Sequence, residues 1–194
     1  EDLPQEAGDA DIDRIAQGSL AALAMPFLSE AAASAAAEQL AVLKSAGDSC
    51  GGQVEVIATG VPAGWGEPVF DSLESTLAHL LFSVPGVKAV EFGAGTAFAG
   101  LRGSEANDPW TTASGAVRSV TNRSGGINGG ISNGMPVSLR VTFRPTPSIA
   151  TAQATVDLSA GSDTVLSIHG RHDPCIAVRA CPVVEAVTAM GLLE

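Results

Sequence analysis

The chain has 194 residues, a formal net charge of −11, a hydrophobic fraction of 45% and a charged fraction of 16%. The hydrophobic content excludes a disordered polypeptide, and the strong negative charge argues against general binding to nucleic acid. The apolar runs are too short for a membrane-spanning helix, so no membrane association is expected. The length suits one folded unit, and we expect a single domain over residues 1–194.

Helices dominate the predicted elements at the front of the chain. A short helix is expected over Ile15–Ala24. A longer, alanine-rich helix is expected over Glu30–Ala46, with Ser29 as its N-cap and Gly47 at its end. Alternating apolar residues then predict a half-buried strand over Gln53–Thr59.

The rest of the chain mixes strands with two further helices. A helix is predicted over 70–83 from its leucine spacing, and strands are predicted over 88–92, 137–143, 151–157 and 164–169. A final helix over Pro174–Leu193 contains Pro182, which must kink or divide it. Strands and helices in this mixed order indicate an α+β fold rather than a doubly wound parallel sheet.

The most unusual stretch is glycine-rich and runs from Asn122 to Ser148. Amides exposed in such a loop can cradle an anion. Arg144, beside the hydroxyls of Thr146 and Ser148, could grip a phosphate. The alternative is a flexible surface loop, but the rigid Arg-Pro-Thr-Pro-Ser end of the stretch argues against it. We therefore predict a ligand site here.

A second segment with candidate chemistry is Gly170–Cys175, between a strand and a helix. Arg171 could bind an anion while Asp173 accepts a proton, which is what an elimination reaction needs. Amides at a helix N-terminus would favour a bound anion further. Alternatively, Asp173 merely caps the helix that begins at Pro174. Cys175 is better explained as a packed thiol than as a nucleophile.

The remaining reactive residues point to no metal and no disulfide framework. The three cysteines, Cys50, Cys175 and Cys181, form no CxxC pair, which suits a reducing cytoplasm. The three histidines are too scattered for a metal site. A P-loop and a Rossmann glycine motif are absent.

Seven ordered motifs resemble those of chorismate synthase. They are GDSCGG (47–52), GVPAGWGEPVFD (60–71), VKAVEFGAG (87–95), RGSEAND (102–108), NRSGGINGGISNGMP (122–136), RPTPS (144–148) and GRHDPCIAVRACPVVEA (170–186). The resemblance implies a β-α-β sandwich, with helices packed between antiparallel sheets, assembled as a cytoplasmic homotetramer.

The same resemblance implies a lyase of the shikimate pathway of aromatic amino acid biosynthesis. Such an enzyme converts 5-enolpyruvylshikimate 3-phosphate to chorismate and phosphate. It uses reduced FMN (FMNH2), which lends an electron transiently, so there is no net redox change. NADPH or an external flavin reductase would supply the reducing equivalents.

Positions carried over from the family's motifs coincide largely with those already singled out. The implied flavin contacts are Pro85, Gly86, Gly129, Arg144, Pro145, Thr146, Pro147, Ser148 and Arg171. The implied catalytic residues are Asp173, for proton movement near the flavin, and Arg171, for the anions of flavin or substrate. Two positions depart from the pattern. Pro85-Gly86 replaces a polar and small pair, and Thr96 replaces a common aromatic residue, which we expect to loosen packing there.

The resemblance covers only the back part of the family's chain. Family members are much longer, and their front part carries a Gly-x-Ser-His-Gly motif and a second catalytic histidine. Here the histidines are His79, His169 and His172, and the chain starts at Glu1 rather than Met. We therefore expect the C-terminal portion of a chorismate synthase, inactive alone. The alternative is an FMN-binding or assembly module from a truncated chorismate synthase.

Overall fold

The structure is a computed structural model that describes residue 13, residues 24–112, residue 115 and residues 117–194. The helix expected over Ile15–Ala24 lies outside these residues, apart from Ala24. The elements in chain order are α2 (Glu30–Ala46), β1 (Gly52–Ala58), η1 (Val69–Asp71), α3 (Leu73–Phe82), β2 (Val87–Phe92), η2 (Gly95–Gly100), α4 (Gly103–Ala106), β3 (Trp110–Thr111), β4 (Arg118–Ser119), β5 (Ile127–Asn128), β6 (Ile131–Ser132), β7 (Val137–Phe143), β8 (Gln153–Asp157), β9 (Ser162–Leu166) and α5 (Ala177–Leu193). Helices and small antiparallel sheets are mixed, as expected.

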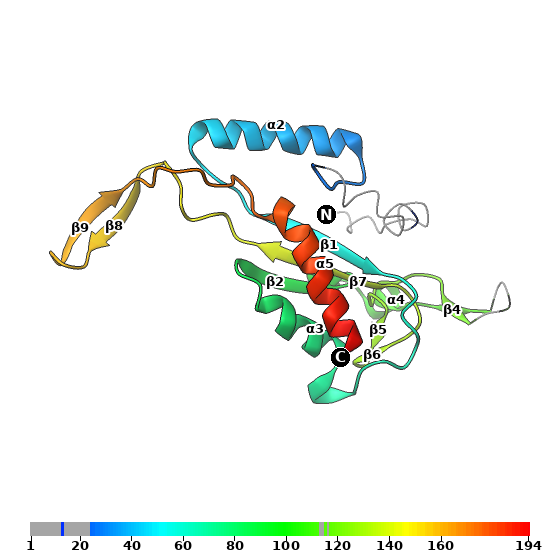
Figure 1. Cartoon of the computed structure of the whole chain (residues 1–194). Helices are drawn as coiled ribbons and strands as arrows, with labels where there is room; N and C mark the ends of the chain where they lie inside the picture. The colour runs from blue at the N-terminus through cyan, green and yellow to red at the C-terminus, as the bar shows by residue number, and fades with distance from the viewer. Residues whose placement is uncertain (1–12, 14–23, 113–114, 116) are drawn as a thin grey trace.

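A three-stranded antiparallel sheet of order β1-β7-β2 forms the centre of the fold (Figure 1). The predicted strand over Val137–Phe143 is confirmed at both ends. Along β7 every second residue is buried, and Ser138, Arg140 and Thr142 on the opposite face are only partly buried. This alternation, which follows from the two-residue period of a strand, gives the sheet one apolar face.

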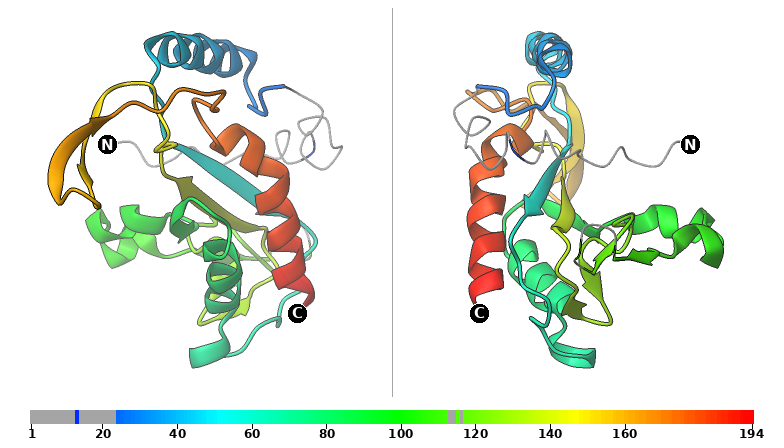
Figure 2. Two further views of the ribbon diagram at one scale, coloured as in Figure 1. Left: turned by 60° about the vertical axis from the view of Figure 1, so that its left-hand side comes forward. Right: turned by 90° about the vertical axis from the view of Figure 1, so that its right-hand side faces the viewer.

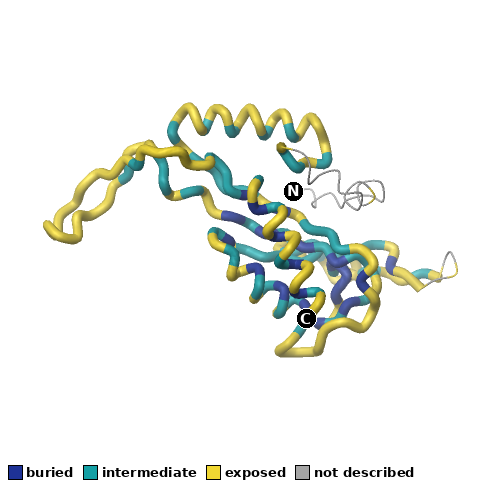
Figure 3. Tube along the Cα trace, in the orientation of Figure 1, coloured by how far each residue is buried: buried dark blue, intermediate teal, exposed yellow. Residues whose placement is uncertain are grey.

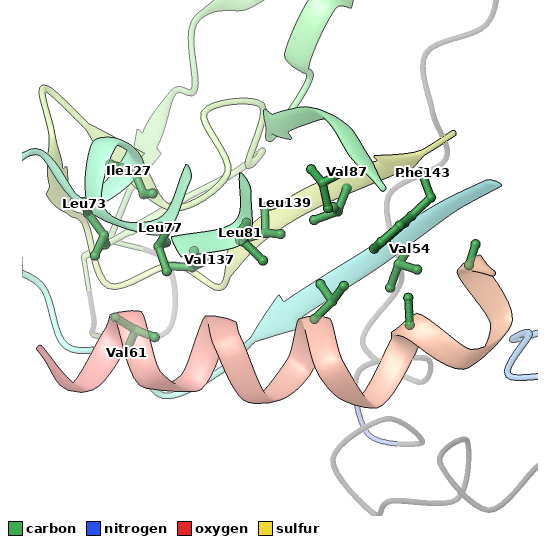
Figure 4. Close-up of a cluster of buried hydrophobic side chains, with 14 residues drawn as sticks. Val54, Val61, Leu73, Leu77, Leu81, Val87, Ile127, Val137, Leu139 and Phe143 are labelled. Atoms are coloured by element: carbon green, nitrogen blue, oxygen red, sulfur yellow. The ribbon is translucent and has the colours of Figure 1, made fainter. Parts of the chain in front are cut away.

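Helices α3 and α5 cover the apolar face of this sheet (Figure 4). Leu77 and Leu81 of α3 and Val184 of α5 are fully buried. Gly191 lets the two helices approach closely, because a Cβ atom on it would lie 2.8 Å from Leu77 Cδ2. The core therefore lies between one sheet face and two helices.

The helix α5 corrects one prediction from the sequence. It begins at Ala177, three residues after Pro174, and it continues through Pro182 as one helix. Of the kink or division expected at Pro182, the division is therefore wrong. Proline costs one hydrogen bond within a helix, and burial of α5 against α3 and β1 offsets that loss.

Two elements project from the central sheet. The helix α2 has the predicted bounds, with the Ser29 hydroxyl accepting from the Ala32 amide at 3.4 Å and Gly47 ending it at a φ of 69°. None of its residues is buried (Figure 3). The hairpin β8–β9 is exposed over almost its whole length and extends away from the sheet (Figure 2). None of the helices in the described part of the chain is long and apolar enough to cross a membrane.

Candidate functional site

Most of the predicted ligand residues meet where β7 ends and β2 begins. The Arg144 amide donates to the Gly86 carbonyl at 2.9 Å, which places the start of the 144–148 segment beside Pro85-Gly86. Gly86 has a φ of 91°, and a Cβ atom on it would lie 2.8 Å from Ile176 Cδ1. The chain can take this path only because that residue is glycine.

Two side-chain hydrogen bonds tie the 144–148 segment to distant parts of the chain. The Ser49 hydroxyl donates to the Thr146 carbonyl at 2.7 Å, and the Thr146 hydroxyl donates to the Asp173 carbonyl at 3.1 Å. We call the region formed by residues 48–50, 85–86, 144–148 and 171–175 the junction. Ser49 was not singled out from the sequence, since nothing local distinguishes it from any other turn serine.

The junction carries two arginines that are free to bind an anion. Arg144 and Arg171 are both exposed, and neither guanidinium makes an ion pair or hydrogen bond with a residue that the structure describes. Because an exposed guanidinium presents five donors in a fixed fork, each can bind a phosphate or carboxylate bidentately. The junction is therefore suited chemically to an anionic ligand.

Asp173 also lies at the junction, but it is not a helix cap. Its carboxylate pairs with Arg179 Nη1 at 2.8 Å, with side-chain exposures of 45% and 78%. This hydrogen bond raises the pKa of Arg179. The helix begins at Ala177, and its N-cap position is Ile176, with no side-chain cap. The capping role considered for Asp173 is therefore wrong, and its carboxylate is exposed and paired with Arg179.

Gly129 does not lie at the junction. It occupies the turn between β5 and β6, with a φ of 61°, and a Cβ atom on it would meet nothing within 4 Å. The next residue, Gly130, accepts a hydrogen bond from the Leu73 amide at the start of α3. The turn is thus at the opposite end of β7 from Arg144 (Figure 1). The chain alone does not bring these two predicted contacts together.

The glycine-rich loop is packed rather than open. The amide of Gly125 donates to the Asn122 carbonyl and that of Gly126 donates to Asn122 Oδ1. Both glycines are buried, and a Cβ atom on Gly125 would lie 2.4 Å from the Gly93 nitrogen. These two amides are occupied, so the expected anion cradle is wrong for them. Glycine is required here because two backbone segments approach each other too closely for a side chain.

Asp108 anchors the start of this loop. Its carboxylate accepts from the Thr121 hydroxyl and from the amides of Arg123 and Ser124, at 2.7–2.9 Å. Burial is the largest single influence and opposes ionisation, but these hydrogen bonds together lower the pKa of Asp108. The charged carboxylate therefore holds residues 121–124 in place.

Thr96 plays a comparable part in the neighbouring turn. Its amide and hydroxyl donate to Glu91 Oε1 at 2.9 and 2.8 Å, and they lower the pKa of Glu91. We expected Thr96 to loosen packing in place of an aromatic residue. In this structure its two hydrogen bonds close the turn between Glu91 and Thr96, and Arg140 donates to the Gly93 carbonyl at 3.1 Å. The looser packing stays a prediction.

The sequence matches one family of known proteins over most of its length. A family model described as chorismate synthase matches residues 9–194. The chain belongs to the chorismate synthase family. It is 53% identical over 163 residues to the chorismate synthase of Methanocella arvoryzae, an alignment that covers 84% of this chain and 44% of that protein. With the chorismate synthase of Opitutus terrae it shares 49% over 173 residues, covering 88% and 47%.

A solved structure of the family agrees with the observed fold. A crystal structure of chorismate synthase matches with a TM-score of 0.67 and 28% sequence identity, over 86% of this chain and 43% of that chain. The expected chorismate synthase-like α+β fold is confirmed. The chain spans about half the length of the curated relatives it matches.

The anchoring role of Asp108 predicts a pH-dependent loss of stability in Asp108→Ala. Without the Asp108 carboxylate, two amides and a hydroxyl lose their acceptor, which should lower the unfolding free energy by about 1–3 kcal/mol at neutral pH. Because the folded pKa lies below the ordinary value of 3.8, this contribution is complete above that pH and is lost as the pH falls through the folded pKa. Urea unfolding at several pH values measures it, with Asp163→Ala on the exposed hairpin as control. An equal loss in both variants would contradict the anchoring role.

Proposed function

We propose that the protein to which this chain belongs is a chorismate synthase in activity as well as in family. It would convert 5-enolpyruvylshikimate 3-phosphate to chorismate by eliminating phosphate, with reduced FMN as cofactor. The observation that carries this proposal is the junction, where two arginines without a partner among the described residues and the exposed carboxylate of Asp173 lie on the motifs shared with the family. Reduced FMN, when bound, supplies an electron transiently to the reacting substrate.

The residues of the junction fit an anionic flavin. Arg144 would pair with the FMN phosphate, beside the backbone of Pro85 and Gly86. The rest of the segment, Pro145, Thr146, Pro147 and Ser148, would line the same ligand, and the hydrogen bonds of Thr146 to Ser49 and Asp173 keep it in one position. Arg171 lies on the adjoining segment and would bind either the flavin or an anionic group of the substrate. Gly129 would contact flavin only if another copy or segment completes the site.

The catalytic roles proposed here belong to Asp173 and Arg171. Asp173 would hold or move a proton near the flavin, and its ion pair with Arg179 orients the carboxylate without burying it. Arg171 would balance the negative charge that leaves with phosphate. Both residues are exposed in this chain, so further protein must exclude water if the elimination occurs here.

The proposal also includes partners and setting. NADPH or an external flavin reductase would reduce the flavin, and the protein would assemble as a homotetramer in the cytoplasm. An exposed α2 and an exposed hairpin β8–β9 support assembly, since isolated projecting elements bury little surface of their own. The second candidate is an FMN-binding or assembly module without activity of its own. The absence from this sequence of a Gly-x-Ser-His-Gly motif favours that candidate for the 194 residues alone.

An anaerobic turnover assay separates these two candidates. The 194-residue chain, and any longer polypeptide that its reading frame encodes, are each supplied with reduced FMN and 5-enolpyruvylshikimate 3-phosphate. We expect chorismate from the longer polypeptide, and flavin binding without turnover from the 194 residues. The proposed function would be contradicted if both polypeptides failed to bind flavin and failed to form chorismate.

Arg144→Ala tests the phosphate contact. Loss of a charge-assisted hydrogen bond should weaken FMN binding about 10- to 100-fold, as measured by fluorescence titration. Arg118→Ala is the matched control, because Arg118 is exposed on β4, away from the junction (Figure 1). Unchanged affinity in Arg144→Ala would show that the phosphate binds elsewhere.

Asp173→Asn tests the proton role in the polypeptide that shows turnover. We expect kcat to fall about 10²- to 10⁴-fold, the usual range for a general acid or base, while the dissociation constant of FMN changes little. Arg179→Ala is the control, since it removes the ion pair but keeps the carboxylate. If Asp173→Asn lowers affinity and turnover to the same extent, Asp173 acts as a structural residue.

A further inference from the structure

Two cysteines that are far apart in the sequence, Cys50 and Cys175, lie on adjoining segments of the junction. The Cys50 amide donates to the Pro174 carbonyl at 2.8 Å. This bond brings the backbone of Cys50 against the residue that precedes Cys175. Cys50 and Cys175 therefore lie on adjoining segments, although no sequence spacing links them.

The side chains of the two cysteines converge as well. Cys175 Sγ donates to the Gly51 carbonyl at 3.6 Å, and a Cβ atom on Gly52 would lie 3.2 Å from the same sulfur. The glycines after Cys50 thus leave room for the sulfur of Cys175. Burial is the largest cause that raises the pKa of Cys50. The charge of Cys175, a hydrogen bond with Cys175 and the charge of Asp48 raise this pKa further. The sulfur of Cys175 thus lies against the residues that follow Cys50.

We propose that Cys50 and Cys175 form a reversible disulfide, and that this pair is a redox-modification site. A disulfide requires Cα atoms roughly 4.4–6.8 Å apart, and the bond from the Cys50 amide to the Pro174 carbonyl at 2.8 Å brings the two backbones close together at this point. Both cysteines are partly accessible in the reduced state. Intracellular disulfides of this kind are usually transient and redox-sensing.

The third cysteine serves a different purpose. Cys181 Sγ donates to the Ala177 carbonyl at 3.5 Å within α5, and burial raises its pKa. Its hydrogen bond directs the sulfur along its own helix. Cys181 is therefore the internal control for the other two.

The reaction needs an oxidant, for which a low-molecular-weight disulfide such as oxidised glutathione suffices. One protein thiol loses its proton, and the thiolate attacks a sulfur of the oxidant, forming a mixed disulfide and releasing one glutathione thiol. The second protein thiolate then attacks the protein sulfur of the mixed disulfide and releases the second glutathione. Two protein thiols are oxidised by two electrons, and one glutathione disulfide is reduced to two thiols.

The disulfide would join the loop after α2 to the segment that carries Arg171 and Asp173. In the reduced protein, two hydrogen bonds hold these segments together. The Ser49 hydroxyl donates to the Thr146 carbonyl, and the Thr146 hydroxyl donates to the Asp173 carbonyl. A covalent link would fix their separation and restrain the segment that carries the proposed catalytic residues. This consequence for catalysis rests on the function proposed above, whereas the formation of the disulfide does not.

A thiol count tests the proposal without flavin or substrate. The 194-residue chain is incubated with oxidised glutathione at mildly alkaline pH, unfolded in denaturant and titrated with Ellman's reagent. We expect the titre to fall from three thiols to one, with loss of two hydrogens in the intact mass and recovery after dithiothreitol. Peptide mapping should link Cys50 to Cys175.

Single variants make the assignment specific. Cys181→Ser should still lose two thiols, while Cys50→Ser and Cys175→Ser should form no internal disulfide and at most a glutathione adduct. A titre that stays at three, a wild-type product that remains a glutathione adduct, or a link that includes Cys181 would each overturn the proposal. Since none of these results involves flavin, failure here leaves the proposed enzyme activity untouched.

Discussion

The burial of one face of β7 is the constraint on which the rest of the structure depends. Its four apolar residues are each at most 2% exposed, and they hold α3 and α5 against the sheet. Because β7 pairs on both sides, its position also determines where β1 and β2 lie. Both candidate regions are attached to its ends. The glycine-rich loop enters at Val137, and the segment that begins with Arg144 leaves after Phe143.

Glycines around this strand serve the packing of backbone against backbone. A Cβ atom on Gly93 would lie 2.0 Å from the Arg123 carbonyl oxygen, and one on Gly51 would lie 2.6 Å from that of Phe143. Such contacts are impossible for any residue with a side chain. The loop is therefore a rigid support held by Asp108 and Asn122. Open backbone is found instead at Gly129, in the β5–β6 turn.

The junction combines rigidity with unpaired charge. Its backbone is tied by Ser49, Thr146 and the amide of Cys50, so the arginines project from a defined frame. In a protein of net charge −11, two arginines without a carboxylate partner among the described residues suit the anionic ligand proposed above. The same frame brings two thiols together, which would couple the proposed ligand site to the redox state of its surroundings.

The amino-acid sequence alone determined the elements with strong local signals. The two-residue period predicted β7 to the residue, the capping pair Ser29 and Gly47 predicted α2, and the ordered motifs indicated the family. Contacts between distant segments were decided only by the tertiary structure: Ser49 bonds to Thr146 across 97 residues, and Cys175 reaches Gly51 across 124. Likewise, only the fold showed that Asp173 pairs with Arg179 and that Gly129 lies apart from Arg144. Periodicity and capping depend on neighbours along the chain. These contacts depend instead on how β7 pairs with β1 and β2, which come from distant parts of the sequence.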